Sequence, residues 1–103
     1  MRISIFKVKQ GKKNELQKWG EEIEKRKEEA TKTLIEENCT EESIRFFEIS
    51  GDTYAVGVMV AGVGQTLVSP NLSDELNQKH IKILNDCFLS ELPLEKMYSI
   101  KVD

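Results

Sequence analysis

Two segments, residues 2–8 and 53–61, are apolar on both sides of an extended chain, and this limits the folds that the sequence can adopt. Strands with this pattern are covered on both faces in folded proteins. Each segment is therefore expected inside a sheet that has apolar groups on either side. The first segment carries Ile3 and Ile5 on one face and Phe6 and Val8 on the other. The second carries Tyr54, Val56, Val58 and Val60 on one face and Ala55, Met59 and Ala61 on the other.

The first part of the chain predicts a strand followed by a long helix. Residues 2–8 are rich in β-branched and aromatic side chains and are followed by Gly11, which is typical of a strand that ends in a turn. In residues 12–38 apolar side chains recur every three or four positions, which predicts one long helix. Asn38 is suited to the left-handed conformation that ends a helix. Residues 40–43 are then expected to turn the chain.

The rest of the chain predicts a hairpin, a second helix and a last strand. Residues 44–49 and 53–61 flank Ser50-Gly51-Asp52, in which glycine supplies the positive φ of a tight turn. Residues 73–90 predict a helix, with Ser73 as its N-cap. Residues 96–102 alternate in polarity as a strand does.

The order β-α-β-β-α-β predicts a single α+β domain over residues 1–103, a ferredoxin-like βαββαβ sandwich. Right-handed crossovers place residues 2–8 and 53–61 in the middle of a four-stranded antiparallel sheet with two helices on one face. Because the helices cover only one apolar face, the other face is expected to pack on a second copy of the chain. A chain of 103 residues has a thin core of its own, so a second protomer adds burial that it needs.

Several motifs resemble a small bacterial family of uncharacterised function. They are Lys9-x-Gly11-Lys12, the Trp19 helix with Arg26-Lys27-Glu28-Glu29-Ala30, Thr40-Glu41-Glu42-Ser43, and Asn77-x-Lys79-His80. The element order and the two-faced sheet are similar to those of the dimeric α/β-barrel group, in which two ferredoxin-like protomers close their sheets into one barrel. Members of that wider group include haem-degrading and antibiotic-biosynthesis monooxygenases and rhamnose mutarotase. The resemblance therefore implies a fold and a homodimer, and no single activity.

Composition and charge argue against several classes of function. Fifteen Lys and Arg stand against 18 Asp and Glu, so no binding to nucleic acid or to an anionic membrane is expected. No apolar run long enough to span a bilayer and no secretory signal is visible. Cys39 and Cys87 fit no zinc or C-x-x-C spacing and are expected as free thiols of a cytoplasmic protein. A single histidine, His80, excludes a multi-histidine metal site, and no cofactor is expected.

A cation interrupts the apolar stripe of the first predicted helix. Helical steps from Leu16 pass Ile23 and then Arg26 before they reach Ala30. One interpretation is a long side chain whose stem lies on apolar surface while its charge reaches water. The other is a cation at the wall of a cleft between helix and sheet, where the planar guanidinium of Arg26 binds a carboxylate or phosphate.

The only histidine lies on the apolar stripe of the second predicted helix. Helical steps from Leu76 pass His80 and then Cys87, so His80 is expected to face the sheet. It is either a half-buried imidazole that hydrogen-bonds to a carbonyl or carboxylate, or a functional group that shuttles protons or binds a metal or haem. If Arg26 also faces the sheet, the two side chains converge on one cavity.

Three further residues are candidates for binding a ligand in that cleft. Gly57 lies inside a predicted central strand, where glycine marks either tight packing or the close approach of a ligand. Trp19 is expected either in the core or beside a bound molecule. Asn77 lies one helical turn before His80 in the motif given above.

Three functional hypotheses follow, and they leave open whether the protein is an enzyme. The first is a homodimer that binds a small anionic organic ligand in the helix/sheet cleft through Arg26 and His80, with His80 as the candidate catalytic residue. The second is a haem-binding or cofactor-free monooxygenase of the dimeric α/β-barrel type, with His80 as axial ligand in the haem case. That resemblance also implies an asparagine in the first strand and a tryptophan after the third, which this sequence does not have. The third is a non-catalytic dimeric interaction module.

Overall fold

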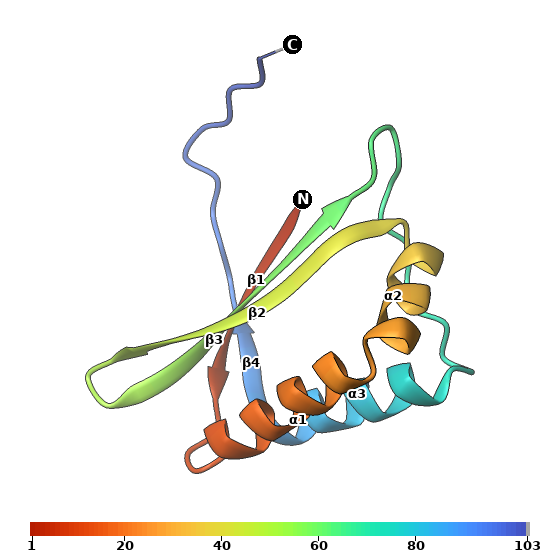
Figure 1. The fold of residues 1–103 in the computed structure, drawn as a ribbon. Coiled ribbons are helices and arrows are strands. Elements are labelled where there is room, and N and C mark those ends of the chain that lie inside the picture. Colours follow the sequence, from red (N-terminus) through yellow and green to blue (C-terminus); the bar gives the residue numbers. More distant parts are fainter. Residues whose placement is uncertain (103) are drawn as a thin grey trace.

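The computed structural model describes residues 1–102, in which four strands form one antiparallel sheet and three helices cover one of its faces (Figure 1). The strands are β1 (Arg2–Val8), β2 (Cys39–Ile49), β3 (Asp52–Ala61) and β4 (Phe88–Leu92). The helices are α1 (Lys13–Lys25), α2 (Lys27–Glu36) and α3 (Glu75–Cys87). The predicted α+β class and the four-stranded antiparallel sheet are therefore confirmed.

The two strands that are apolar on both faces lie at the centre of the sheet, as predicted. The strand order is β2-β3-β1-β4, and all neighbouring pairs are antiparallel. Side chains paired across an antiparallel ladder share a face. We call the face without helices the open face. It carries the pairs Ile3 with Val58 and Ile5 with Val56, whereas Ser4 with Gly57 and Phe6 with Ala55 face the helices.

Left-handed residues connect elements where the sequence places turns. Asn38 has φ 60° and follows α2, which confirms its predicted role at the end of a helix. Ser50 and Gly51 both have positive φ and join β2 to β3 in a two-residue hairpin. The turn expected over residues 40–43 is wrong, because β2 already begins at Cys39 and pairs with β3 along its length.

The single helix expected over residues 12–38 is in fact two helices. α1 ends at Lys25, Arg26 leaves the helical conformation with φ −101° and ψ 35°, and α2 begins at Lys27. The backbone N–H of Arg26 still donates to the carbonyl of Glu22, so the chain bends between α1 and α2 while this helical hydrogen bond is kept. The bend lets α1 run beside α3 while α2 lies over β2 (Figure 1). Neither proline nor glycine marks this position, so the sequence gives no sign of the break.

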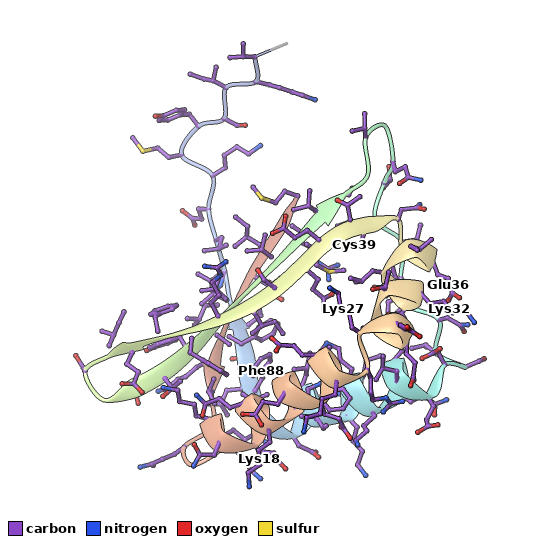
Figure 2. The ribbon with its side chains drawn as sticks, viewed as in Figure 1. Lys18, Lys27, Lys32, Glu36, Cys39 and Phe88 are labelled. Atoms are coloured by element: carbon purple, nitrogen blue, oxygen red, sulfur yellow. The ribbon has the colours of Figure 1, made fainter. Side chains whose placement is uncertain are left out.

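The last strand is not at residues 96–102 but at β4, which follows α3 directly. The second predicted helix ends at Cys87, because Phe88 turns inward, stacks on Phe6 with ring centroids 4.7 Å apart and pairs with Val8. Figure 2 shows Phe88 between the sheet and the helices. Pro93 follows β4 and has no N–H to continue the ladder. Residues 93–102, which we call the C-terminal arm, form neither helix nor strand and run away from the helices (Figure 1).

The core is small and lies between β1, β3 and the ends of α1 and α3. Its buried residues are Val8, Leu16, Ala55 and Cys87. Burial, together with a 2.9 Å hydrogen bond to the Glu15 carboxylate, raises the pKa of the Cys87 thiol to about 11. Cys39, at the start of β2, is also buried, with 4% of its surface exposed. Both thiols are free and buried, so neither is placed to act as a nucleophile.

Candidate functional site

A cavity of about 550 Å³ lies between the helix-facing side of the sheet and all three helices. β1, β2 and β3 form its floor, and α1, α2 and α3 form its walls. The small core of Val8, Leu16, Ala55 and Cys87 leaves the space above Ala55 and Gly57 unfilled. A volume of this size accommodates a small organic molecule.

Four of the five residues singled out by the sequence line this cavity. They are Trp19, Gly57, Asn77 and His80. Gly57 lies in the floor, where an added Cβ would meet only the Ser4 carbonyl oxygen at 3.9 Å. The floor at this point is therefore bare backbone, and the space above it is open.

Trp19 and His80 form a hydrogen-bonded pair that joins α1 to α3. The indole Nε1–H donates to Nδ1 of His80 over 2.8 Å, and the ring centroids are 6.0 Å apart. Burial lowers the pKa of His80, so the imidazole is neutral near pH 7. Because Nδ1 accepts, the proton of the neutral ring is on Nε2. His80 thus offers the cavity an N–H donor.

This tautomer decides what His80 can do chemically. Ligation of a metal or haem through Nε2 needs a lone pair there, and so does action as a general base at that atom. Either role moves the ring proton to Nδ1, where it would face the indole N–H of Trp19. The arrangement therefore favours a hydrogen-bond donor over the proton shuttle or axial ligand considered from the sequence.

A second residue of α3 holds Trp19 from its solvent side. The ammonium of Lys79 lies 5.2 Å from the centroid of the indole ring and forms a 2.9 Å ion pair with Glu22 of α1. Trp19 is only 5% exposed, so its ring is fixed between this cation and the cavity. The motif around Asn77 and His80 thus includes a lysine that positions the tryptophan.

Arg26 does not join His80. Its guanidinium pairs with the carboxylate of Glu29, with Nη2 to Oε2 at 2.7 Å, and the residue is not among those lining the cavity. The expected convergence assumed that Arg26 continues the helical stripe of Leu16 and Ile23. Because α1 ends at Lys25, Arg26 is out of phase with that stripe.

Asn77 has a structural task beside the cavity. Its side-chain amide donates to the Asn71 carbonyl over 3.1 Å, and its backbone N–H is capped by the Asp74 carboxylate, also at 3.1 Å. The N-cap of α3 is therefore Asp74 and not Ser73 as expected. These bonds fix the connection before α3 against the wall of the cavity.

The cavity is also lined by a charged group that the sequence did not single out. Glu37 follows α2, is 7% exposed, and its carboxylate makes no hydrogen bond or ion pair within residues 1–102. Burial, and then the nearby Glu42, raise its pKa, while Arg2 acts in the opposite direction. The signal was present, because Glu37 continues the stripe of Ala30 and Leu34 at helical spacing.

The protonation state of His80 predicts a pH dependence of stability. In the unfolded chain the imidazole binds a proton near its ordinary pKa of 6.5, whereas burial lowers this pKa in the folded protein. The free energy of unfolding is therefore expected to fall as the pH decreases from 7.5 through 6.5 and below. A His80→Gln variant should lack this part of the decrease, as measured by urea unfolding at each pH.

In the same experiment Glu37 changes the free energy of unfolding with pH in the opposite direction to His80. Its raised pKa contributes stability at low pH that is lost as the pH rises through the folded value. Both proteins contain Glu37, so the difference between wild type and His80→Gln isolates the histidine. Equal pH dependence in the two proteins would contradict a lowered pKa of His80.

Comparison with known proteins matches the chain to one family model. A family model described as "Family of unknown function (DUF6176)" matches residues 1–101. No curated protein and no solved structure matches the chain. Within residues 1–102, no helix has the length and apolar character to cross a membrane, and no three His, Cys, Asp or Glu side chains are grouped to hold a metal ion.

Proposed function

The chain belongs to DUF6176, a family of unknown function, and we propose that it binds a small organic molecule in the cavity between sheet and helices. The observation that carries this proposal is the 2.8 Å Trp19–His80 hydrogen bond, which holds a neutral imidazole with its N–H available to the cavity. A half-buried polar group fixed by a second side chain in a largely apolar cavity is typical of a ligand site.

The lining indicates a ligand with an apolar body and two different polar ends. Ile23, Leu34 and Leu76 are among the apolar wall residues. At one end, His80 Nε2–H requires a hydrogen-bond acceptor such as a carbonyl, ether or hydroxyl oxygen. A site of this kind favours ligands that pair this half-buried N–H over analogues that leave it unpaired.

The other end favours a cationic group rather than an anion. An anionic ligand was predicted from Arg26, which pairs with Glu29 outside the cavity. Glu37, Glu42 and Arg2 line the far end, so two carboxylates face one guanidinium there. The Glu37 carboxylate opens onto the cavity without a hydrogen-bond partner among residues 1–102, so a ligand amine would supply the missing positive charge and hydrogen-bond donors.

We further propose that the protein is a ferredoxin-like sandwich that dimerises through the open face, as in dimeric α/β barrels. The order β2-β3-β1-β4 supports this classification, since it interleaves two β-α-β halves around central β1 and β3. The open face supports the dimer. Besides the isoleucine and valine pairs given above, it carries Phe47 stacked on Tyr54 with ring centroids 5.1 Å apart, and helices cover none of it.

Binding can be measured with the neutral fluorophore N-phenyl-1-naphthylamine. Trp19 is the only tryptophan and lines the cavity, so a probe bound there is expected to accept its excitation energy. Saturable energy transfer from Trp19 with a micromolar Kd is the expected result. Neither transfer nor enhanced probe fluorescence at saturating concentrations would overturn the proposed site.

The charge of the ligand is tested by displacing this probe. We expect 4-phenylbutylamine to displace it at about tenfold lower concentration than 4-phenylbutyrate, because only the amine pairs with Glu37. Glu37→Gln should abolish that preference. Glu28→Gln is the matched control, since Glu28 is exposed on α2 and is not among the charges that shift the pKa of Glu37. Equal displacement by amine and acid in the wild type would remove the assigned role of Glu37.

A further inference from the structure

The C-terminal arm has the character of a strand that lacks a partner. Its apolar side chains are among the most exposed in the molecule, with Met97 at 94%, Tyr98 at 73%, Ile100 at 79% and Val102 at 89% exposed. Figure 1 shows the arm running away from the helices after β4. An isolated monomer gains nothing from presenting four such side chains to water.

The sequence of the arm is that of an amphipathic strand. Leu94, Tyr98, Ile100 and Val102 share one face of an extended chain, and only Lys96 interrupts it. The opposite face is polar apart from Met97. Proline occurs only at the first position and glycine does not occur, so nothing within the arm prevents strand pairing.

The same chain presents an edge that fits the arm. β2 lies at the edge of the sheet, and its outer side pairs with no other segment of residues 1–102. It is 11 residues long, so its length of about 36 Å matches the roughly 33 Å of a ten-residue arm. β2 carries three glutamates and one arginine, whereas the arm carries two lysines and one glutamate. An unpaired edge of this length is a ready template for another strand.

We propose that two copies of the chain exchange their C-terminal arms, each arm pairing as a fifth strand with the β2 edge of the other copy. This inference rests on the proposed dimer through the open face. In such a dimer the two sheets face each other, and the two-fold axis lies between them and parallel to the strands. This symmetry reverses the strand order of one sheet relative to the other. β4 of each copy therefore lies over β2 of the other copy. The arm continues from β4 and therefore starts beside the partner's free edge.

Exchange also explains why the arm leaves its own sheet. Within one copy β4 and β2 lie at opposite edges, three strand spacings or about 14 Å apart. Pro93 ends the pairing of β4 with β1, so the arm does not continue along its own neighbour. In the exchanged dimer the apolar face of the arm covers the margin between the two sheets, and both β2 edges are closed.

The test compares two faces of the arm by sedimentation equilibrium. A Tyr98→Asp/Ile100→Asp double variant changes the apolar face. Ser99→Asn/Lys101→Arg changes the polar face of the same segment and keeps the positive charge that faces the glutamates of β2. Because every residue from 93 to 102 is exposed in the part of the chain that the structure describes, both variants are expected to fold. The first is expected to raise the Kd of the dimer about 100-fold or more, through the loss of two large buried side chains. The polar-face variant should change the Kd of the dimer less than tenfold.

Hydrogen exchange locates the arm in the wild-type dimer. The outward-facing amides of β2 should be protected in the wild type and exchange fast in the Tyr98→Asp/Ile100→Asp variant. A dimer that survives this variant, or whose β2 amides exchange fast, would overturn the exchange of arms while leaving dimerisation through the open face intact. A wild-type monomer at micromolar concentration would overturn both, and neither result would alter probe binding in the cavity.

Discussion

A Gly57→Phe variant is expected to bind N-phenyl-1-naphthylamine 10- to 100-fold more weakly than the wild type while keeping its fold. Gly57 lies in the cavity floor with no positive φ, and an added Cβ meets only the Ser4 carbonyl oxygen at 3.9 Å. A phenyl ring at this position occupies the space proposed for the ligand, and ligand and ring then clash at a cost of about 1–3 kcal/mol. Aromatic residues are also favoured in strands, so no loss of stability accompanies the change.

Two milder substitutions control this experiment. Gly57→Ala adds one methyl group and should reduce affinity only slightly. Gly20→Ala lies in α1, where a Cβ meets no atom within 4 Å, and it should stabilise the helix by about 1 kcal/mol without affecting the probe. Probe affinity that is unchanged in Gly57→Phe would show that the molecule binds elsewhere.

A Trp19→Ala variant is expected to lose about 3–5 kcal/mol of unfolding free energy, which is a large part of the stability of a domain of this size. Trp19 is 5% exposed and links α1 to α3 through His80 and Lys79. Trp19→Phe keeps a ring in place but leaves Nδ1 of His80 without its donor, at a smaller cost of about 1–3 kcal/mol. Urea unfolding followed by circular dichroism measures both.

The exposed neighbour of Trp19 provides the control. Lys18 lies on the outer surface of α1 (Figure 2), and Lys18→Ala should change stability by less than about 0.5 kcal/mol. If Trp19→Phe is as harmless as Lys18→Ala, the hydrogen bond to His80 contributes nothing to the fold and does not hold the imidazole. The probe's own fluorescence then tests whether binding survives in Trp19→Phe.

Hydrophobic alternation predicted the sheet well because burial on both faces leaves a direct pattern in the sequence. β1 and β3 were placed at the centre from the element order and right-handed crossovers, and their apolar side chains on both faces agreed with that position. The register confirms which residues share a face. The end of α3 was harder to predict. The inward turn of Phe88 depends on its contact with Phe6, which is distant in sequence, and strand propensity drew the prediction to residues 96–102 instead.

The candidate site was predicted where a polar residue on an apolar stripe stays in helical phase. His80 on α3 satisfies this condition, and it lines the cavity together with Trp19 of the apolar stripe of α1. Arg26 does not, because α1 ends at Lys25 and neither proline nor glycine marks that break in the sequence. The Trp19–His80 bond joins residues 61 positions apart, so spacing within one helix does not reveal it.

The break at Arg26 has a dynamic consequence for the cavity. α2 is joined to α1 by one non-helical residue, and Thr33 is its only buried side chain. The free energy needed to detach α2 from the sheet is therefore lower than that of α1 or α3, which share the core. We expect the ligand to enter when α2 transiently moves away from the sheet about Arg26. This motion is expected to be faster than unfolding of the whole domain.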